Sequence, residues 1–256
     1  MHTPLEWIRF LTEIADEADA IALRLFRIGT LKVQVKPDSS PVSEADQEIE
    51  ATARQLVARH HPELGILGEE EGETGSRDRR LILDPIDGTR NFVRGIPVFA
   101  SLLAIELEGE VVAGLVSAPA LGQRWHAARG AGAWNRDRQL RVSPISQWPE
   151  AQVFHGSLSG GEAREVPPGL FTLIRQSDRS RGYGDFWQHM LVAEGSGEVA
   201  VDPRVAPWDI AALQVVVEEA GGRATTLSGE RSIYGGSLVS SNRALHDSAI
   251  QLLQSH

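Results

Sequence analysis

The sequence of 256 residues contains no cysteine and only two lysines. Without cysteine, the chain can form no disulfide, no thiolate metal site and no cysteine nucleophile. No stretch approaches the roughly 18 consecutive apolar residues that indicate a membrane-spanning helix. The first 20 residues lack both the basic segment and the long apolar run of a secretory signal peptide. We therefore expect a cytoplasmic protein that does not act at a membrane.

Positive charge is scarce as well. The chain carries 35 Asp and Glu against 25 Lys and Arg, which gives a formal net charge of -10. Such a balance argues against non-specific nucleic-acid binding, because the phosphate backbone attracts basic surfaces. The excess acid is either a solvated surface or, in part, a site for cations. The hydrophobic content of 41% is ordinary for a globular protein with a large core.

Two carboxylates follow an apolar, strand-like run in the segment 81–92, LILDPIDGTRNF. Asp84 and Asp87 lie three residues apart with Pro85 between them. Carboxylates held this close repel each other unless a cation or a proton lies between them. Hard cations such as Mg²⁺ prefer these oxygen ligands. The alternative is a purely structural pair of turn-capping aspartates.

The two residues after Asp87 suggest a phosphate site. Gly88 permits a tight turn, and Thr89 begins a short predicted helix over RNFV. Backbone N–H groups at such a turn point in one direction and bind anions. The segment therefore offers metal ligands, phosphate donors and a hydroxyl within twelve residues.

Three more acidic residues stand at the ends of predicted elements. Glu69 follows the short strand 65–68. Asp209 lies in the first turn of the helix predicted over 208–220, and Asp46 follows Ser43 at the start of another helix. Each has a local alternative: an exposed acidic loop for Glu69, the helix dipole for Asp209, and a capping box for Asp46.

Helical and strand-like segments alternate along the whole chain, without a repeat. This pattern predicts an α/β protein with helices layered on sheets. We place a lobe boundary in the segment 143–150, between an N-terminal lobe (1–145) with most ligands and a C-terminal lobe (146–256) with Asp209. Helices are predicted over 4–27, from 43, over 185–194, over 208–220 and from 242. Strands are predicted over 65–68, 81–84, 100–107, 111–118, 153–156, 198–201 and 238–240.

Together these motifs resemble the inositol-monophosphatase-like family. The resemblance rests on G-E-E at 68–70, D-P-I-D-G-T-R-N-F at 84–92 and W-D-I-A-A at 208–212, with S-E-A-D at 43–46 and G-L-V-S-A-P at 114–119. The family implies an αβαβα sandwich like that of fructose bisphosphatase. It also implies a Mg²⁺-dependent, lithium-sensitive phosphatase that acts on a small phosphorylated substrate, commonly as a homodimer.

The resemblance further implies two or three Mg²⁺ ions per site. One ion is assigned to Glu69, Asp84 and the backbone carbonyl of Ile86. A second is assigned to Asp84, Asp87 and Asp209, so that Asp84 bridges the two ions. A third, weaker ion would use Glu69 and waters.

The remaining chemistry is assigned in the same way. The amides of Gly88 and Thr89 bind the phosphate. Asp46, Thr89 and Glu69 are the implied catalytic residues, with Asp46 and Thr89 orienting and activating the attacking water. Paired metal ions about 3.5–4 Å apart lower the pKa of such a water and neutralise the oxygens at both ends of the displacement. Arg90 departs from the family, which often has a second threonine at this position.

The leaving group is indicated by R-G-Y-G-D-F-W at 181–187, which resembles the histidinol-phosphate phosphatase branch. Histidinol phosphate carries an ammonium and an imidazole, and such cations favour carboxylates and aromatic faces. We therefore expect Asp185 and Asp202 to bind the leaving group. The other candidates for this wall are Arg181, Tyr183, Phe186 and Trp187, with helix packing as the alternative for Phe186 and Trp187.

Two other functions remain open from the sequence. One is an inositol monophosphatase or a phosphatase of another sugar phosphate. The other is a metal-binding regulatory protein that uses the same fold without turnover.

Overall fold

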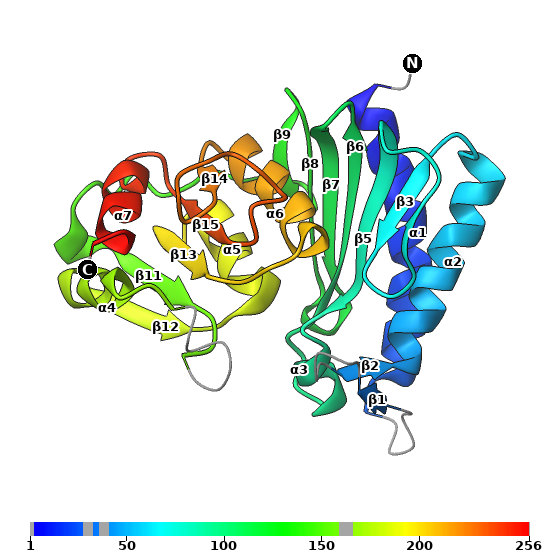
Figure 1. The fold of residues 1–256 in the computed structure, drawn as a ribbon, viewed down its shortest axis with the longest axis horizontal. Helices are drawn as coiled ribbons and strands as arrows, with labels where there is room; N and C mark the ends of the chain where they lie inside the picture. The colour runs from blue at the N-terminus through cyan, green and yellow to red at the C-terminus, as the bar shows by residue number, and fades with distance from the viewer. Residues whose placement is uncertain (1–2, 28–32, 36–40, 159–165, 256) are drawn as a thin grey trace.

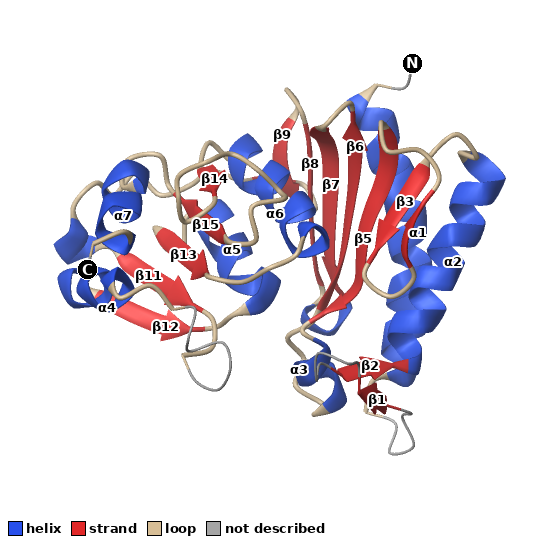
Figure 2. Ribbon diagram, viewed as in Figure 1, coloured by secondary structure: helices blue, strands red, loops and turns tan. Residues whose placement is uncertain are grey.

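The computed structural model describes residues 3–27, 33–35, 41–158 and 166–255. Five layers follow one another across the molecule, as helices, sheet, helices, sheet and helices (Figures 1 and 2). The predicted αβαβα sandwich is therefore confirmed. The division into lobes at residue 145 remains a prediction, because the middle layer of helices packs against both sheets.

The first layer is formed by α1 (Pro4–Leu25) and α2 (Glu44–His60). Thr3 and Glu6 form a capping box at the start of α1, and Ser43 and Asp46 form one at the start of α2. The capping box that the sequence offered as a local role for Asp46 is therefore present. Trp7 and Phe10 of α1 lie in the core, whereas Leu5 is 62% exposed.

The second layer is a sheet of eight strands, in which β3 and β5 are parallel and the other neighbours are antiparallel. The predicted hairpin of 100–107 and 111–118 is confirmed as β6 and β7. In spatial order the strands are β10 (Arg138–Gln139), β9 (Gly132–Asn135), β8 (Gln123–Ala128), β7 (Glu110–Ala118), β6 (Ala100–Leu107), β5 (Arg79–Asp87), β3 (Gly65–Gly68) and β4 (Gly72–Thr74). A separate pair, β1 (Val33–Val35) and β2 (Pro41–Ser43), precedes α2.

The middle layer consists of α5 (Asp185–Ala193) and α6 (Pro207–Glu219). Helix α6 packs against β6 and β7 of the first sheet and against β14 and β15 of the second. Nine of its thirteen residues are apolar, and its segment IAALQVVV is buried throughout. A helix that is apolar on nearly all sides is typical of a layer covered on both faces.

The fourth layer is a sheet of five strands in which β12, β11 and β13 are parallel. In spatial order they are β12 (Arg179–Gly182), β11 (Gln152–His155), β13 (Val199–Asp202), β15 (Leu238–Ser241) and β14 (Arg223–Thr225). The outer layer is formed by α4 (Gly169–Gln176) and α7 (His246–Leu253). Strand β12 and helix α4 were not predicted, since both follow a Gly- and Pro-rich stretch that reads as loop.

Helix α7 begins at His246, four residues later than predicted. The helix starts late because Asn242, which is fully buried, forms hydrogen bonds that hold the residues before it in another conformation. Its Oδ1 accepts the N–H of Leu245, and its Nδ2 donates to the carbonyls of Ser143 and Ile145. Asn242 thus fastens the connecting segment 143–150 to the second sheet.

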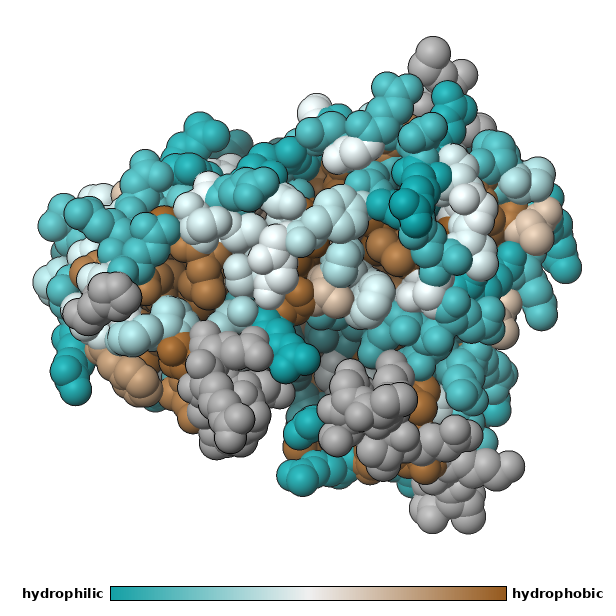
Figure 3. Space-filling model, in the orientation of Figure 1, coloured by the Kyte–Doolittle hydropathy of each residue, from teal (hydrophilic) through white to brown (hydrophobic). Residues whose placement is uncertain are grey.

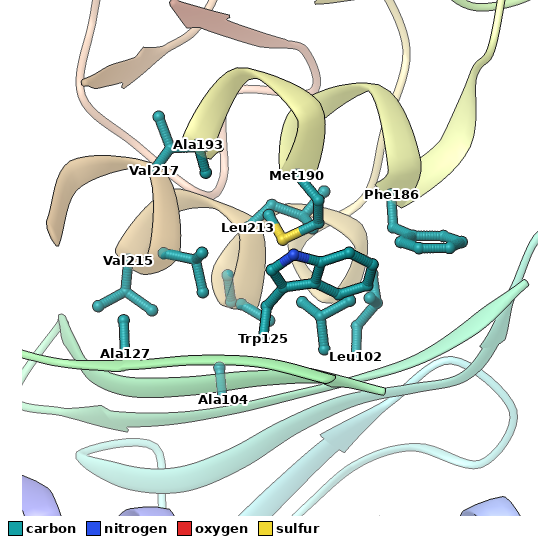
Figure 4. Packing of buried hydrophobic residues seen from close by; sticks show 14 of the residues in the cluster. Leu102, Ala104, Trp125, Ala127, Phe186, Met190, Ala193, Leu213, Val215 and Val217 are labelled. Carbon is teal, nitrogen blue, oxygen red and sulfur yellow. The ribbon is translucent and has the colours of Figure 1, made fainter. Parts of the chain in front are cut away.

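The largest core lies between the first sheet and the middle helices. Figure 4 shows the indole of Trp125 between the sheet and the two helices, with Met190, Leu213 and Phe186 around it. Trp125 is 2% exposed, and its Nε1 donates to Glu194 at 2.8 Å. This core fixes α5 and α6 against the sheet that carries the acidic motif.

A polar contact also joins the two sheets. Tyr234, in the segment between β14 and β15, donates its hydroxyl to Glu106 of β6 at 2.7 Å. Arg80 of β5 donates to Glu106 at 2.6 Å and also contacts the Tyr234 hydroxyl. Buried charges are stable only when they are paired in this way.

Hydrophilic residues cover most of the face drawn in Figure 3. No helix among the described residues is both long and apolar enough to cross a membrane.

Gly114 of β7 tests the packing between the first sheet and α6. A Cβ at this position would lie 2.5 Å from Cγ1 of Val215 and 3.1 Å from the backbone of Ala212. We expect Gly114→Ala to lower the free energy of unfolding by about 1–3 kcal/mol, as for other overpacked cores. Urea unfolding measures this change. An unaltered midpoint would show that α6 moves away from the sheet at little cost.

Candidate active site

The centre of the site is the end of β5. The strand departs from regular pairing with β6 between Asp84 and Asp87. Ser101 of β6 holds this irregular stretch, since its hydroxyl donates to the Pro85 carbonyl at 2.7 Å. Asp84 is 2% exposed, whereas Asp87 is partly buried. Both carboxylates therefore lie where β5 leaves its regular pairing with β6, at the end of the strand.

Gly88 makes the turn into the short helix α3 (Thr89–Val93). Its φ of 84° lies in the left-handed region, which favours glycine. The Thr89 hydroxyl donates to the carbonyl of Ile86 at 2.9 Å and lies 3.4 Å from Oδ1 of Asp46. The predicted phosphate-binding residues thus adjoin the predicted metal ligands.

Helix α6 brings Asp209 to the same place from 122 positions further along the chain. Asp209 lies in the first turn of α6, as predicted, and it also accepts the backbone N–H of Ala206 at 2.7 Å. Carboxylate oxygens of Asp84, Asp87 and Asp209 all lie within 4.8 Å of one another. Glu69, which follows β3, lines the same pocket.

The electrostatics of this cluster are unfavourable without a cation. Burial, then the carboxylates of Glu69 and Asp87, raises the pKa of Asp84 well above its usual range. Burial, then the Asp185 and Asp209 carboxylates, does the same for the pKa of Asp87. Burial raises the pKa of Asp209 to about 7. Such raised values are typical of carboxylates built to face a positive charge.

The residues present fit a divalent cation. Oδ1 of Asp84 is buried and has no hydrogen-bond partner among the described residues. A buried carboxylate oxygen without a donor is costly, and a hard cation satisfies it. The donor set consists of oxygen atoms alone, which suits Mg²⁺ better than metals that favour nitrogen or sulfur.

Asp46 lies behind this cluster on α2 and is fully buried. Its Oδ2 accepts from the backbone N–H and the hydroxyl of Ser43, at 2.8 and 2.6 Å. Burial raises the pKa of Asp46 to about 6, although the bonds from Ser43 lower it. Oδ1 remains on the side of Thr89, as the predicted pairing of these residues requires.

The cluster forms one end of a pocket of about 710 Å³. Its lining combines Gly88, Thr89, Arg90 and Asn91, around the start of α3, with Gly182, Tyr183, Gly184 and Asp185, from the end of β12 to the start of α5. Tyr183, Asp185 and Asp202 line the part of this pocket that the second sheet supplies. The structure therefore brings these three of the six candidates for the leaving-group wall next to the acidic cluster.

The other predicted wall residues differ in their positions. Arg181 is exposed on the edge strand β12, and its guanidinium donates to the carbonyl of Ser180 rather than lining the pocket. Phe186 adjoins the pocket, but it is fully buried and its ring lies 6.0 Å from that of Trp125, so it packs in the core as the helix-packing alternative predicted. Trp187 is partly buried and stacks on Tyr183 with ring centres 4.8 Å apart.

Comparison with known proteins now gives this arrangement a family. The model of the inositol monophosphatase family matches residues 4–256. The chain belongs to the inositol monophosphatase family. A histidinol-phosphatase of Mycobacterium tuberculosis is 44% identical over 94% of this chain and 95% of its own length. A histidinol-phosphatase of Streptomyces coelicolor is 42% identical over 97% of each chain. An inositol-1-monophosphatase of Rhizobium meliloti is 32% identical over 89% of this chain and 88% of its own.

Solved structures agree with the family assignment. The extragenic suppressor protein suhB of Bartonella henselae superposes with a TM-score of 0.91 at 27% identity, over 98% of this chain and 99% of its own. The IMPase of Thermotoga maritima gives 0.86 at 30% identity, over 97% and 96%. This member of the inositol monophosphatase family is a phosphoric monoester hydrolase.

One buried residue outside the family motifs holds the turn that carries Glu69. Glu50, one turn after Asp46 on α2, is fully buried. It accepts the backbone N–H groups of Glu70 and Glu71 at 2.9 and 3.0 Å and pairs with Arg54. It therefore fixes the turn that carries Glu69. Its i+4 spacing from Asp46 was the available signal, since it places both side chains on one face of the helix.

Arg90, the departure from the family pattern, is exposed and lines the pocket beside Thr89. It does not displace Thr89, whose hydroxyl keeps its position near Asp46.

We expect Glu50→Ala to lower both phosphatase activity and the midpoint of thermal unfolding. The change removes the carboxylate that accepts the N–H groups of Glu70 and Glu71 and pairs with Arg54, and a hydrogen bond to a charged group is worth about 1.5–3 kcal/mol. The matched control is Glu48→Ala on the same helix, whose side chain is 47% exposed and pairs with Arg24 at the surface. Equal behaviour of the two variants, by thermal melting and phosphate release, would deny Glu50 this role.

Proposed function

We propose that this protein hydrolyses L-histidinol phosphate to L-histidinol and phosphate, as a Mg²⁺-dependent enzyme of histidine biosynthesis. The observation that carries the choice of substrate is the sequence likeness: the two histidinol-phosphatases above are 44% and 42% identical, against 32% for the inositol-1-monophosphatase. Each comparison spans most of both chains, so the difference is not one of coverage.

The charge of the pocket supports the same substrate. Its lining includes six carboxylates against two arginines. Glu69, Asp84, Asp87 and Asp209 are the proposed metal ligands, which leaves Asp185 and Asp202 with their negative charge. Histidinol offers an ammonium and an imidazole to these carboxylates, whereas inositol offers only hydroxyls.

Phosphate binding is proposed for the turn at Gly88. The amides of Gly88 and Thr89 would receive the phosphate oxygens, beside the carbonyl of Ile86. Asp46 and Thr89 would hold the attacking water and take its proton, because the Thr89 hydroxyl lies between the Ile86 carbonyl and the Asp46 carboxylate. Glu69 is proposed to act with them.

Two or three Mg²⁺ ions are proposed for the acidic cluster. When bound, they would offset the charge of the phosphate and lower the pKa of the attacking water. Support comes from the three carboxylates within 4.8 Å and from the buried Asp84 oxygen that lacks a donor.

Inositol 1-phosphate or another sugar phosphate remains the second candidate, since relatives with that activity in their names are 30–33% identical. On the family resemblance alone, we further propose that the enzyme is a cytoplasmic homodimer inhibited by lithium.

Mg²⁺ should raise the midpoint of thermal unfolding, and by more at about pH 8 than at about pH 5.5. The folded-state pKa values of Asp84, Asp87 and Asp209 are raised, so the metal-free fold loses stability as pH rises through about 7 and these groups ionise. The same ionisation creates the ligands, so metal binding strengthens over that range. Scanning calorimetry at both pH values measures the two shifts.

Asp84→Asn should remove most of this Mg²⁺ effect and reduce turnover by several orders of magnitude, because Asp84 is assigned to both metals. The control is Asp137→Asn, which removes an exposed acid from a turn far from the cluster in sequence. A folded Asp84→Asn enzyme with nearly full activity would overturn the two-metal assignment.

Asp202→Asn should lower kcat/KM for histidinol phosphate by about ten- to a hundredfold, the value of one charged hydrogen bond of about 1.5–3 kcal/mol. Glycerol 2-phosphate should be affected much less, because its leaving group has no cation. Phosphate release from both substrates measures the ratio. Equal losses would assign Asp202 to structure or metal binding, and a wild-type preference for inositol 1-phosphate would replace the proposed substrate.

A further inference from the structure

We propose that Gln188 and His189 are positioning residues that hold the Asp202 carboxylate with one oxygen turned to the leaving group, and so set the preference for a cationic substrate. This inference rests on the proposed function. Neither residue belongs to the motifs on which the family resemblance was based.

Both residues bind the same oxygen of Asp202. Nε2 of Gln188 donates to Oδ2 of Asp202 at 2.7 Å, and Nε2 of His189 lies 2.8 Å from that atom. Gln188 and His189 are fully buried in α5, and Asp202 lies at the end of β13. His189 and Asp202 line the pocket, whereas Gln188 does not. Two donors on one oxygen fix the rotation of the carboxylate far better than one.

The neighbours of His189 fix the orientation of its ring. A carboxylate only accepts hydrogen bonds, so Nε2 is the donor to Asp202. On the other side of the ring, Nδ1 lies 2.8 Å from Oγ of Ser240. The order serine, histidine, aspartate matches a hydrolytic triad, but Ser240 is fully buried in β15 and does not line the pocket. Ser240 therefore orients the ring and is no nucleophile.

The second oxygen of Asp202 lies beside Gly156, another residue of the pocket wall. A Cβ at position 156 would come within 2.6 Å of Oδ1, so only glycine leaves this oxygen uncovered. The arrangement thus separates the two oxygens: Oδ2 is used for support, and Oδ1 is left for a ligand.

The side-chain amide of Gln188 leaves one buried polar atom without a partner, which packing alone does not explain. Its Oε1 is buried and has no hydrogen-bond partner among the described residues. Turning the amide over would place this oxygen against the Asp202 carboxylate, so the observed orientation serves the bond to Asp202. Buried polar atoms left unsatisfied in this way are rare and are associated with functional sites.

Helix α5 also connects the two ends of the pocket. The N–H of Phe186 donates to Oδ2 of the metal-ligand candidate Asp87 at 2.5 Å. Two residues later the same helix begins to hold Asp202. One rigid element therefore fixes the position of the leaving-group carboxylate relative to the metal cluster.

The test compares kcat and KM for histidinol phosphate and glycerol 2-phosphate at saturating Mg²⁺. We expect His189→Leu and Gln188→Leu each to lower the ratio of the two kcat/KM values about tenfold, mainly through a higher KM for histidinol phosphate. His189→Gln should recover most of the ratio, because its Nε2 replaces the ring donor. Ser240→Ala, a smaller change, should lower the ratio less than His189→Leu.

Two controls separate positioning from damage to the fold. Met190→Leu changes a buried neighbour on α5 at similar volume and should leave the ratio unaltered. In an Asp202→Asn background, His189→Leu should have no further effect on the ratio, as expected for residues that act through one another.

An unchanged ratio in both leucine variants would overturn the proposal, and so would equal losses on the two substrates. Additive effects with Asp202→Asn would overturn it as well. A wild-type enzyme that does not prefer histidinol phosphate would instead refute the proposed function, and this inference with it.

Discussion

Mutual repulsion among the carboxylates of Asp84, Asp87 and Asp209 is the constraint on which the rest of the structure depends. These groups come from a strand and a helix that are far apart in the sequence, and burial raises the pKa of each. A fold that held them loosely would relieve the repulsion by moving them apart. Instead, Ser101 fixes the bent end of β5, the Ala206 amide fixes Asp209, and the core around Trp125 fixes α6 against the sheet. The large apolar core thus stabilises an arrangement that repulsion among the carboxylates destabilises.

Three of the acidic residues also hold the backbone. Asp46 completes the capping box of α2, Asp209 accepts the N–H of Ala206, and Asp87 accepts that of Phe186. The local alternatives that the sequence offered for Asp46 and Asp209 therefore describe real contacts, and these contacts leave room for a chemical role. A carboxylate that caps one element keeps a second oxygen, which the fold can direct to another element.

The alternation of helices and strands and the pair of Asp84 with Asp87 were predictable from sequence because their signals are local or strongly patterned. The order of the five layers and the addition of Glu69 and Asp209 to the acidic cluster came from the family resemblance. Alternation defined β6 and β7, and the pairing of Asp84 with Asp87 is visible within four residues. Features set by distant contacts escaped prediction. Helix α7 starts late because Asn242 bonds to Ser143 and Ile145, almost 100 residues earlier. Phe186 reads as a wall residue in its motif, yet the Trp125 core takes its ring. Gln188 and His189 have no motif at all, and their contact with Asp202 exists only after β13 and α5 have packed.

The position of β12 has a consequence for the way substrate preference changes during evolution. Strand β12 is the edge of the second sheet and pairs only with β11, and the chain passes from it directly into Tyr183 and Asp185. The metal-ligand candidates Glu69, Asp84 and Asp87 belong instead to the first sheet. Mutations at the edge of the second sheet can therefore reshape the wall that faces the leaving group while the inner strands of the other sheet keep the hydrolytic centre intact. The wall that faces the leaving group and the strand ends that carry Glu69, Asp84 and Asp87 can therefore be altered one at a time.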